Sequence, residues 1–179
     1  MKNHSNRLAC EYLVLKAQEG DATALDTLLK SWQKCLWALA CSLANRDAAP
    51  DILQESMLAI ARGIRGLEDP ACFKSWAYRI VSNKSRDWIR GNERRCRLKD
   101  SVSEAPVAAS DDSIADRIAL LQGCLENLPA DQRGILKLFY LEGMSAGEVA
   151  VVLSVPEGTV KSRLFTARAK LKSIINQNQ

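Results

Sequence analysis

The chain contains few residues that interrupt helices. Among its 179 residues are nine glycines and five prolines, too few turn-forming residues for a fold of many short strands. The longest nearly apolar stretch, Leu36 to Ala44, is far shorter than the roughly 18 residues of a membrane-spanning helix. Glu11 and Lys16 interrupt the N-terminal segment, which therefore lacks the apolar core of a signal peptide. We expect a helical, cytoplasmic protein without membrane insertion.

Residues typical of metal and catalytic centres are also scarce. The one histidine is His4, and none of the six cysteines belongs to a Cys-x-x-Cys pair. The spacing therefore predicts no metal site, and we expect no cofactor. No pairing of a nucleophile with a general base is visible, so the sequence favours a protein that is not an enzyme. Cys72 and Cys96 have polar neighbours, which leaves a redox role open for them.

The net charge is small, but charge is strongly segregated along the chain. The 25 basic and 21 acidic residues give a net charge of only +4. Residues 62–99 hold 11 basic and 4 acidic side chains, and residues 157–179 hold 5 basic and 1 acidic. Residues 8–61 and 100–156 are acidic on balance. Two basic segments separated by an acidic one indicate two nucleic-acid contacts on one chain.

The segment 98–113 is small, polar and acidic, and it has no helical or strand periodicity. Such a composition predicts a linker. The linker separates an N-terminal domain over 8–97 from a C-terminal domain over 114–175, and both domains have helical patterns. We therefore predict an all-α fold in which two helical domains are joined by a flexible acidic linker.

In the N-terminal domain, residues 22–44 have leucines and Trp32 at helical spacing, and Asp21 is a candidate N-cap. A second helix is predicted over 48–64. Its polar face, opposite an apolar core face, carries Asp51, Gln54, Glu55 and Leu58. A polar face is usually only solvated, but a leucine within an acid–amide patch favours a protein-binding surface.

The helix predicted over 73–90 has two distinct faces. Its apolar face consists of Phe73, Ala77, Ile80, Val81 and Trp88. Its basic stripe, at spacing i, i+4, i+7 and i+11, consists of Arg79, Asn83, Arg86 and Arg90. Trp76 lies at the edge of the stripe, where an aromatic ring is able to stack on an unpaired base. Charged stripes are often only solvated surface, but the planar fork of arginine suits phosphate groups, so we favour nucleic-acid contact.

The C-terminal domain is predicted to contain helices over 114–126, 130–142, 146–153 and 157–175. Ser145 and Glu148 form a capping box at the start of the third of these helices. The last two helices and the short turn between them make a helix-turn-helix whose final helix is basic. Opposite the apolar face of that helix lie small polar residues, which are able to approach base edges closely. They are Gly158, Thr159, Ser162 and Thr166.

Three motifs occur in a fixed order along the chain. They are Asp51-Ile-Leu-Gln-Glu55, Phe73-Lys-Ser-Trp-Ala-Tyr-Arg-Ile-Val-Ser-Asn83, and Leu128-Pro129 followed by Gly158-Thr-Val-Lys-Ser-Arg163 and Ala167-Arg-Ala-Lys-Leu171. In this order they resemble bacterial RNA polymerase sigma factors of the sigma-70 family, extracytoplasmic-function subfamily. The resemblance covers about 10–173. Ser154 departs from the pattern, because the family often has glycine in this turn.

The resemblance implies a role for each segment. The helix matching 47–64 would bind the coiled coil of the largest subunit of core RNA polymerase through Asp51, Gln54, Glu55 and Leu58. The segment matching 62–90 would melt and read the −10 promoter element through Trp76, Arg79, Asn83, Arg86 and Arg90, with a base-reading loop near Arg65 to Cys72. The last helix would read the −35 element as duplex through Glu157, Thr159, Lys161, Ser162, Arg163 and Arg168. Further partners implied are promoter DNA, the polymerase flap region and an anti-sigma factor.

Two rival hypotheses belong to other functional classes. A stand-alone helix-turn-helix regulator would bind a palindromic duplex as a dimer and use its N-terminal domain to sense a signal. The second basic, tryptophan-containing domain argues against it. An anti-sigma-like decoy would bind regulators but not promoters, and the basic last helix disfavours it. We therefore favour a promoter-specificity subunit that binds core polymerase and catalyses no reaction.

Overall fold

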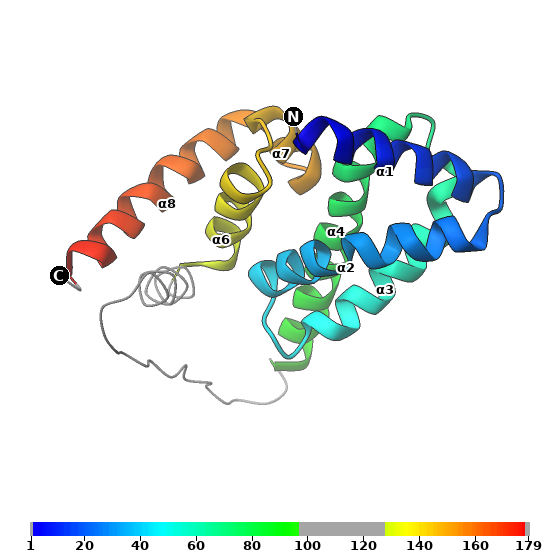
Figure 1. The fold of residues 1–179 in the computed structure, drawn as a ribbon. Coiled ribbons are helices and arrows are strands. Elements are labelled where there is room, and N and C mark those ends of the chain that lie inside the picture. Colours follow the sequence, from blue (N-terminus) through cyan, green and yellow to red (C-terminus); the bar gives the residue numbers. More distant parts are fainter. Residues whose placement is uncertain (1, 97–127, 178–179) are drawn as a thin grey trace, which may run out of the picture. The chain divides into compact units, whose positions relative to one another are not determined.

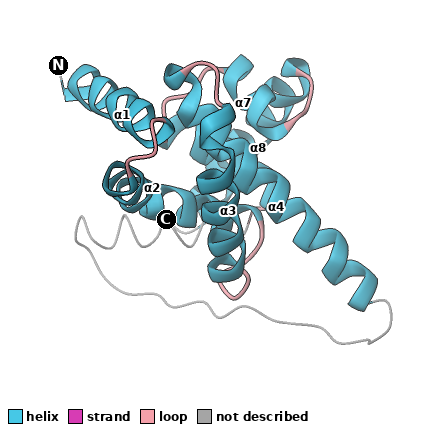
Figure 2. Ribbon diagram, turned by 90° about the vertical axis from the view of Figure 1, so that its right-hand side faces the viewer, coloured by secondary structure: helices cyan, strands magenta, loops and turns pink. Residues whose placement is uncertain are grey.

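The computed structural model describes residues 2–96 and 128–177, and within these ranges every regular element is a helix (Figure 1). Figure 2 shows these helices joined by loops. The predicted all-α class with two helical domains is confirmed for this part of the chain. The linker predicted over 98–113 and the helix predicted over 114–126 lie outside the described residues. None of the described helices is long and apolar enough to span a membrane.

The chain divides into two compact units, Met1–Ile89 with Val151–Ser154 and Arg90–Ala150 with Val155–Gln179. Before residue 97 the elements are α1 (Lys2–Gln18), α2 (Ala22–Leu43), α3 (Ala49–Gly63), the 3-10 turns η1 (Ile64–Gly66) and η2 (Pro70–Cys72), and α4 (Phe73–Cys96). After residue 127 they are α6 (Ala130–Leu136), the π-helical turn η3 (Lys137–Leu141), α7 (Ala146–Leu153) and α8 (Glu157–Gln177).

Helix α1 is not predicted by the periodicity of the sequence. Val14 and Ala17 are buried, but Leu8, Tyr12 and Leu15 are exposed, so apolar residues lie on both sides of the helix. A helix of this kind lacks the single apolar stripe that a sequence pattern shows. Its contacts with α2, η1 and η2 stabilise it instead.

Helix α2 begins where the sequence predicts it. The Asp21 carboxylate accepts hydrogen bonds from the backbone N–H groups of Thr23 at 2.8 Å and Ala24 at 3.0 Å, which confirms the predicted N-cap. On the buried side of α2, the Trp32 ring makes edge-on contacts with Phe73 and Tyr78, at centroid distances of 5.5 and 5.9 Å. This aromatic cluster packs α2 against α4, the helix that carries the basic stripe.

The helix predicted over 130–142 differs from the structure in its second half. It is α-helical only to Leu136, continues as the π turn η3, and ends before Gly143, whose φ is +64°. The predicted capping box is confirmed. The Ser145 N–H donates to the Glu148 carboxylate at 2.8 Å, and the Glu148 N–H donates to the Ser145 hydroxyl at 3.2 Å.

Helices α7 and α8 form the predicted helix-turn-helix. The apolar face of α8 is buried at Val160, Leu164 and Ala167 and half-buried at Leu171. In the turn before α8, Ser154 has a φ of +49°. This is the left-handed region that glycine adopts most easily, so the departure from the family pattern at Ser154 is a strained position.

Candidate functional site

The acid–amide face of α3 is exposed. The four residues predicted there all lie on the surface: Asp51, Gln54, Glu55 and Leu58. Leu58 is 49% exposed, whereas Ile52 and Ile60 of the same helix are buried in the core. The structure therefore brings the four residues together on one face, with an apolar side chain among polar ones.

One residue of this face already has an ionic partner. The Glu55 carboxylate lies 2.9 Å from the ammonium group of Lys84 on α4. Both side chains are more than one-third exposed, and such surface pairs are weak because water and salt screen them. A binding partner with a basic side chain is therefore able to replace Lys84.

The predicted basic stripe of α4 lies on one side of the helix. Arg79, Asn83 and Arg90 are exposed. Arg86 is half-buried and donates hydrogen bonds to Asn83 Oδ1 and Ser82 Oγ, both at 3.2 Å. Arg86 thus orders the neighbouring amide, while Arg79 and Arg90 present their charges to solvent.

Trp76 is more constrained than the sequence suggests. Its indole is half-buried and contacts the Phe73 ring at a centroid distance of 6.0 Å. A Cβ built on Gly63 would approach Cζ2 of Trp76 to 3.0 Å, so the ring lies directly on this glycine. A larger side chain at residue 63 would therefore crowd the indole across the end of α3. The contact fixes the ring orientation before any ligand arrives.

The loop between α3 and α4 is mostly exposed from Arg65 to Cys72. Asp69 organises its second half, because its carboxylate accepts from the Ala71 N–H at 2.9 Å and from the Cys72 thiol at 3.4 Å. The hydrogen bond to Asp69 raises the pKa of Cys72, and burial contributes further. The thiol is therefore kept protonated, which disfavours the reactive thiolate.

The residues predicted on α8 fall into two groups. Glu157, Lys161, Ser162 and Arg168 are exposed, and Thr159 and Arg163 are half-buried. Several already have partners within the C-terminal helices. Lys161 pairs with Glu157 at 2.7 Å, and Arg163 Nε lies 3.5 Å from a carboxylate oxygen of Asp131.

Arg168 is oriented by aromatic rings. Its guanidinium lies 5.4 Å from the centroid of the Tyr140 ring and 5.8 Å from that of Phe139. Such cation–π contacts hold the side chain against η3. The π turn that the sequence does not predict therefore contributes to the placement of a predicted contact residue.

The sequence prediction omits one prominent residue of α8. Phe165 is 74% exposed, although large apolar side chains are usually buried. It follows Lys161 by four positions and Ser162 by three, so it shares their side of the helix. The sequence does contain a signal for this exposure. Phe165 directly follows the core residue Leu164, so in a helix its side chain points away from the buried face.

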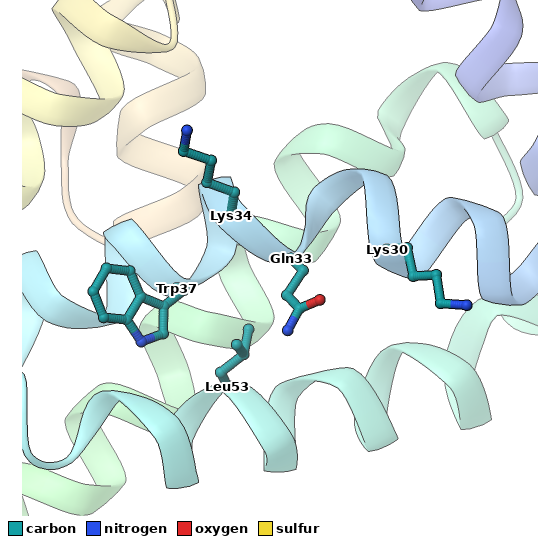
Figure 3. Close-up of a pocket in the computed structure, with 5 residues that line it drawn as sticks. All are labelled: Lys30, Gln33, Lys34, Trp37 and Leu53. Carbon is teal, nitrogen blue, oxygen red and sulfur yellow. The ribbon is translucent and has the colours of Figure 1, made fainter.

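A shallow pocket lies between α2 and α3. It is lined by Lys30, Gln33, Lys34, Trp37 and Leu53. Figure 3 shows Gln33 reaching from α2 toward Leu53 of α3, whereas Lys34 points away from α3. None of the predicted site residues lines this pocket. The described residues also contain no cluster of three His, Cys, Asp or Glu side chains that could hold a metal ion.

Two models from one protein family match the chain in succession. The model described as Sigma-70 region 2 matches residues 28–95, and the model described as Sigma-70, region 4 matches residues 118–171. The two matches together cover more than half of the sequence. The chain belongs to the sigma-70 family. The family predicted from the three sequence motifs is thereby confirmed.

Bacterial relatives match this sigma factor over nearly their whole length. The ECF RNA polymerase sigma-E factor of Haemophilus influenzae is 28% identical over 186 residues, which cover 96% of this chain and 97% of the relative. The factor of the same name from Escherichia coli is 28% identical over 177 residues, which cover 92% and 93%. The predicted extracytoplasmic-function subfamily is therefore also confirmed.

Solved structures of two proteins resemble this sigma factor. CnrH, solved in complex with the cytosolic domain of CnrY, has a TM-score of 0.67 and 26% identity, and the match covers 96% of this chain and 99% of that chain. The sigma factor RpoE of Bartonella quintana, solved with the anti-sigma factor NepR, has a TM-score of 0.72 and 25% identity. That match covers 86% of this chain and 98% of RpoE.

The family match groups the predicted site residues by region. The α3 face, the base-reading loop and the α4 stripe all lie within region 2, and the α8 set lies within region 4. Helix α1 ends at Gln18, before the region 2 match begins at residue 28. The roles of individual residues in this sigma factor stay predictions.

Proposed function

We propose that this sigma factor binds core RNA polymerase and directs promoter-specific initiation, reading the −35 element as duplex and the −10 element as a melted strand. The observation that carries the proposal is the occurrence of two basic surfaces on one chain, each in a different matched region of the sigma-70 family. A stand-alone helix-turn-helix regulator needs only the second surface, so it is not favoured. In this proposal the chain is an initiation factor and catalyses no reaction itself.

The face of α3 is the proposed contact with the coiled coil of the largest polymerase subunit. Protein interfaces usually have an apolar centre within a polar rim, and Leu58 is an exposed apolar side chain among polar ones. Asp51 and Glu55 add negative charge, which suits a basic partner surface. For the C-terminal helices we propose contact with the polymerase flap region.

The α4 stripe and the preceding loop are the proposed −10 site. Melting removes base stacking, at a cost of about 1.4 kcal/mol per base-pair step. Exposed Arg79 and Arg90 suit the phosphates of the melted strand. The Trp76 ring, packed on Gly63, offers a preoriented aromatic surface on which an unpaired base is able to stack. Capture of that base offsets part of the melting cost.

Helix α8 is the proposed −35 reader. Ser162 and Thr159 are small enough to allow close approach to base edges, and Lys161 supplies charge for the phosphate backbone. Phe165 extends this surface, because an apolar ring is able to contact the methyl group of thymine. Arg163 and Arg168 are held at the sides of the helix by Asp131 and by the rings of η3.

An anti-sigma factor is the proposed regulatory partner. The support is the similarity to RpoE of Bartonella quintana, which was solved with the anti-sigma factor NepR. Such a partner would compete with polymerase for the sigma factor. We propose that the chain acts in the cytoplasm, where core polymerase and DNA are found.

Run-off transcription with core polymerase and a pool of genomic promoter fragments tests the proposal. We expect the chain to direct transcripts from a subset of promoters, and core polymerase alone to give none of them. DNA binding without promoter-directed transcripts would contradict the proposal and favour a stand-alone regulator. Absence of both would contradict both functions.

A further inference from the structure

Gln18, the last residue of α1, contacts the start of the base-reading loop through two hydrogen bonds. Its side-chain Nε2 donates to the carbonyl oxygens of Ile64 at 2.9 Å and Leu67 at 2.6 Å. An amide NH2 group has two hydrogens, so these contacts use both. The side chain is half-buried. One residue therefore joins α1 to both ends of η1.

The two carbonyl groups flank the residues at which the chain leaves α3. Ile64 is buried and still helical, whereas Leu67 has extended geometry with φ −77° and ψ 109°. Arg65 and Gly66 lie between them and are exposed. Gln18 holds the carbonyl groups before and after Arg65 and Gly66, so it restricts the backbone conformations of these two residues.

The turn after α1 supports the same loop at a second point. Gly20 has a φ of +100°, and a Cβ built there would lie 3.6 Å from Nη2 of Arg65. The Arg65 guanidinium thus lies against the turn between α1 and α2. Helix α1 also contacts η2, at the far end of the loop. Contacts from α1 and its turn therefore reach both ends of the loop.

We infer that Gln18 is a positioning residue for the base-reading loop and sets the selectivity for the base captured from the −10 element. Gln18 acts through the carbonyl groups of Ile64 and Leu67 and does not itself contact DNA. This role rests on the proposed function and goes beyond it, because residue 18 lies outside the region 2 match. Loss of the two hydrogen bonds frees η1 to adopt other geometries, which lowers discrimination between bases.

Three substitutions separate hydrogen bonding from shape. Gln18→Glu keeps the shape of the side chain but removes both N–H donors, and its carboxylate faces two carbonyl oxygens. Gln18→Met removes the donors without adding charge. Gln18→Lys keeps N–H donors, on a side chain that is one bond longer. The readout is a ratio: transcription by core polymerase from a promoter with the preferred −10 base, divided by transcription after that base is replaced.

We expect the ratio to fall about five- to tenfold for Gln18→Glu and Gln18→Met, and to stay within about twofold of wild type for Gln18→Lys. Only folded factor contributes to both transcripts, so partial unfolding does not change the ratio. An unchanged ratio in Gln18→Glu and Gln18→Met, or an equal fall in Gln18→Lys, would overturn this inference alone. A wild-type chain without promoter-dependent transcripts would instead overturn the proposed function, and the inference with it.

Discussion

At the scale of single residues, the turn of the helix-turn-helix contains a strained position. Ser154 adopts φ +49°, a conformation that costs a side-chain-bearing residue about 1 to 2 kcal/mol. Part of this cost would be regained with glycine, which is also more flexible in the unfolded chain. The position is in the turn that orients α8, so its backbone geometry bears directly on the proposed −35 reader.

We predict that Ser154→Gly raises the free energy of unfolding by about 0.5 to 1 kcal/mol, because the strain is larger than the extra entropy that glycine loses. Urea denaturation followed by circular dichroism measures this change. Ser154→Ala is the matched control, since alanine keeps the Cβ, and it should give no gain. A loss of stability in the glycine variant would show that the positive φ is not a source of strain.

A second residue-scale prediction concerns the thiol of the base-reading loop. The hydrogen bond to Asp69 raises the pKa of Cys72, so less thiolate is present at a given pH below that pKa. Asp69→Asn removes the negative charge and should lower the pKa, which increases the rate of alkylation by iodoacetamide at pH 8. Peptide mass spectrometry resolves the rate at Cys72 from that at Cys35, which serves as the internal control. A slower or unchanged rate at Cys72 would contradict the assigned cause.

Local signals account for the residues that could be predicted from the sequence. Asp21 and the pair Ser145 and Glu148 cap helices through groups only two or three positions away, so their chemistry is visible in short stretches of sequence. Gly63 carries no such signal. Its role depends on Trp76, which packs on it from another helix, and a contact of this kind appears only in the folded chain.

At the scale of elements, the proposed contact between the face of α3 and core polymerase leads to a direct prediction. We predict that Leu58→Asp lowers affinity for core polymerase by about 30-fold or more, because it places a charge at the apolar centre of the proposed interface. Binding of labelled sigma factor to core polymerase, followed by fluorescence anisotropy, measures the change.

Leu15→Asp on α1 is the matched control for that experiment. Leu15 and Leu58 are equally exposed, at 49%, so both changes place the same charge on a similarly accessible helix surface. We expect Leu15→Asp to leave the affinity for core polymerase near the wild-type value. Equal losses for the two variants would indicate a general effect on the unit rather than an interface at α3.

Elements differ in how well their sequences predict them. Helices α2, α3 and α8 each bury one regular apolar stripe, and periodicity identifies such helices. Helix α1 has exposed and buried apolar residues on different sides, so its contacts with α2 and the loop decide its place. The helical periodicity of the sequence does not reveal the π turn η3. A single turn of five residues is too short to change the spacing of apolar residues visibly.

At the scale of the whole molecule, the small net charge is the sum of strongly basic and acidic segments. The basic residues concentrate in 62–99 and 157–179, which contain the α4 stripe and α8. In the proposed function, two weak DNA contacts on one chain act together once core polymerase fixes their separation, because each raises the effective concentration of the other. In the proposed function the two surfaces therefore act at different steps, duplex recognition at α8 and strand capture at α4.

The most direct test of that division compares Arg79→Ala and Lys161→Ala in holoenzyme. Gel-shift titration on a closed duplex measures recognition, and permanganate reactivity of −10 thymines measures melting. We predict that Arg79→Ala reduces open complex far more than duplex binding, whereas Lys161→Ala reduces duplex binding first and open complex only in proportion. Equal losses of both quantities in Arg79→Ala would contradict the central claim that α4 acts on the melted strand.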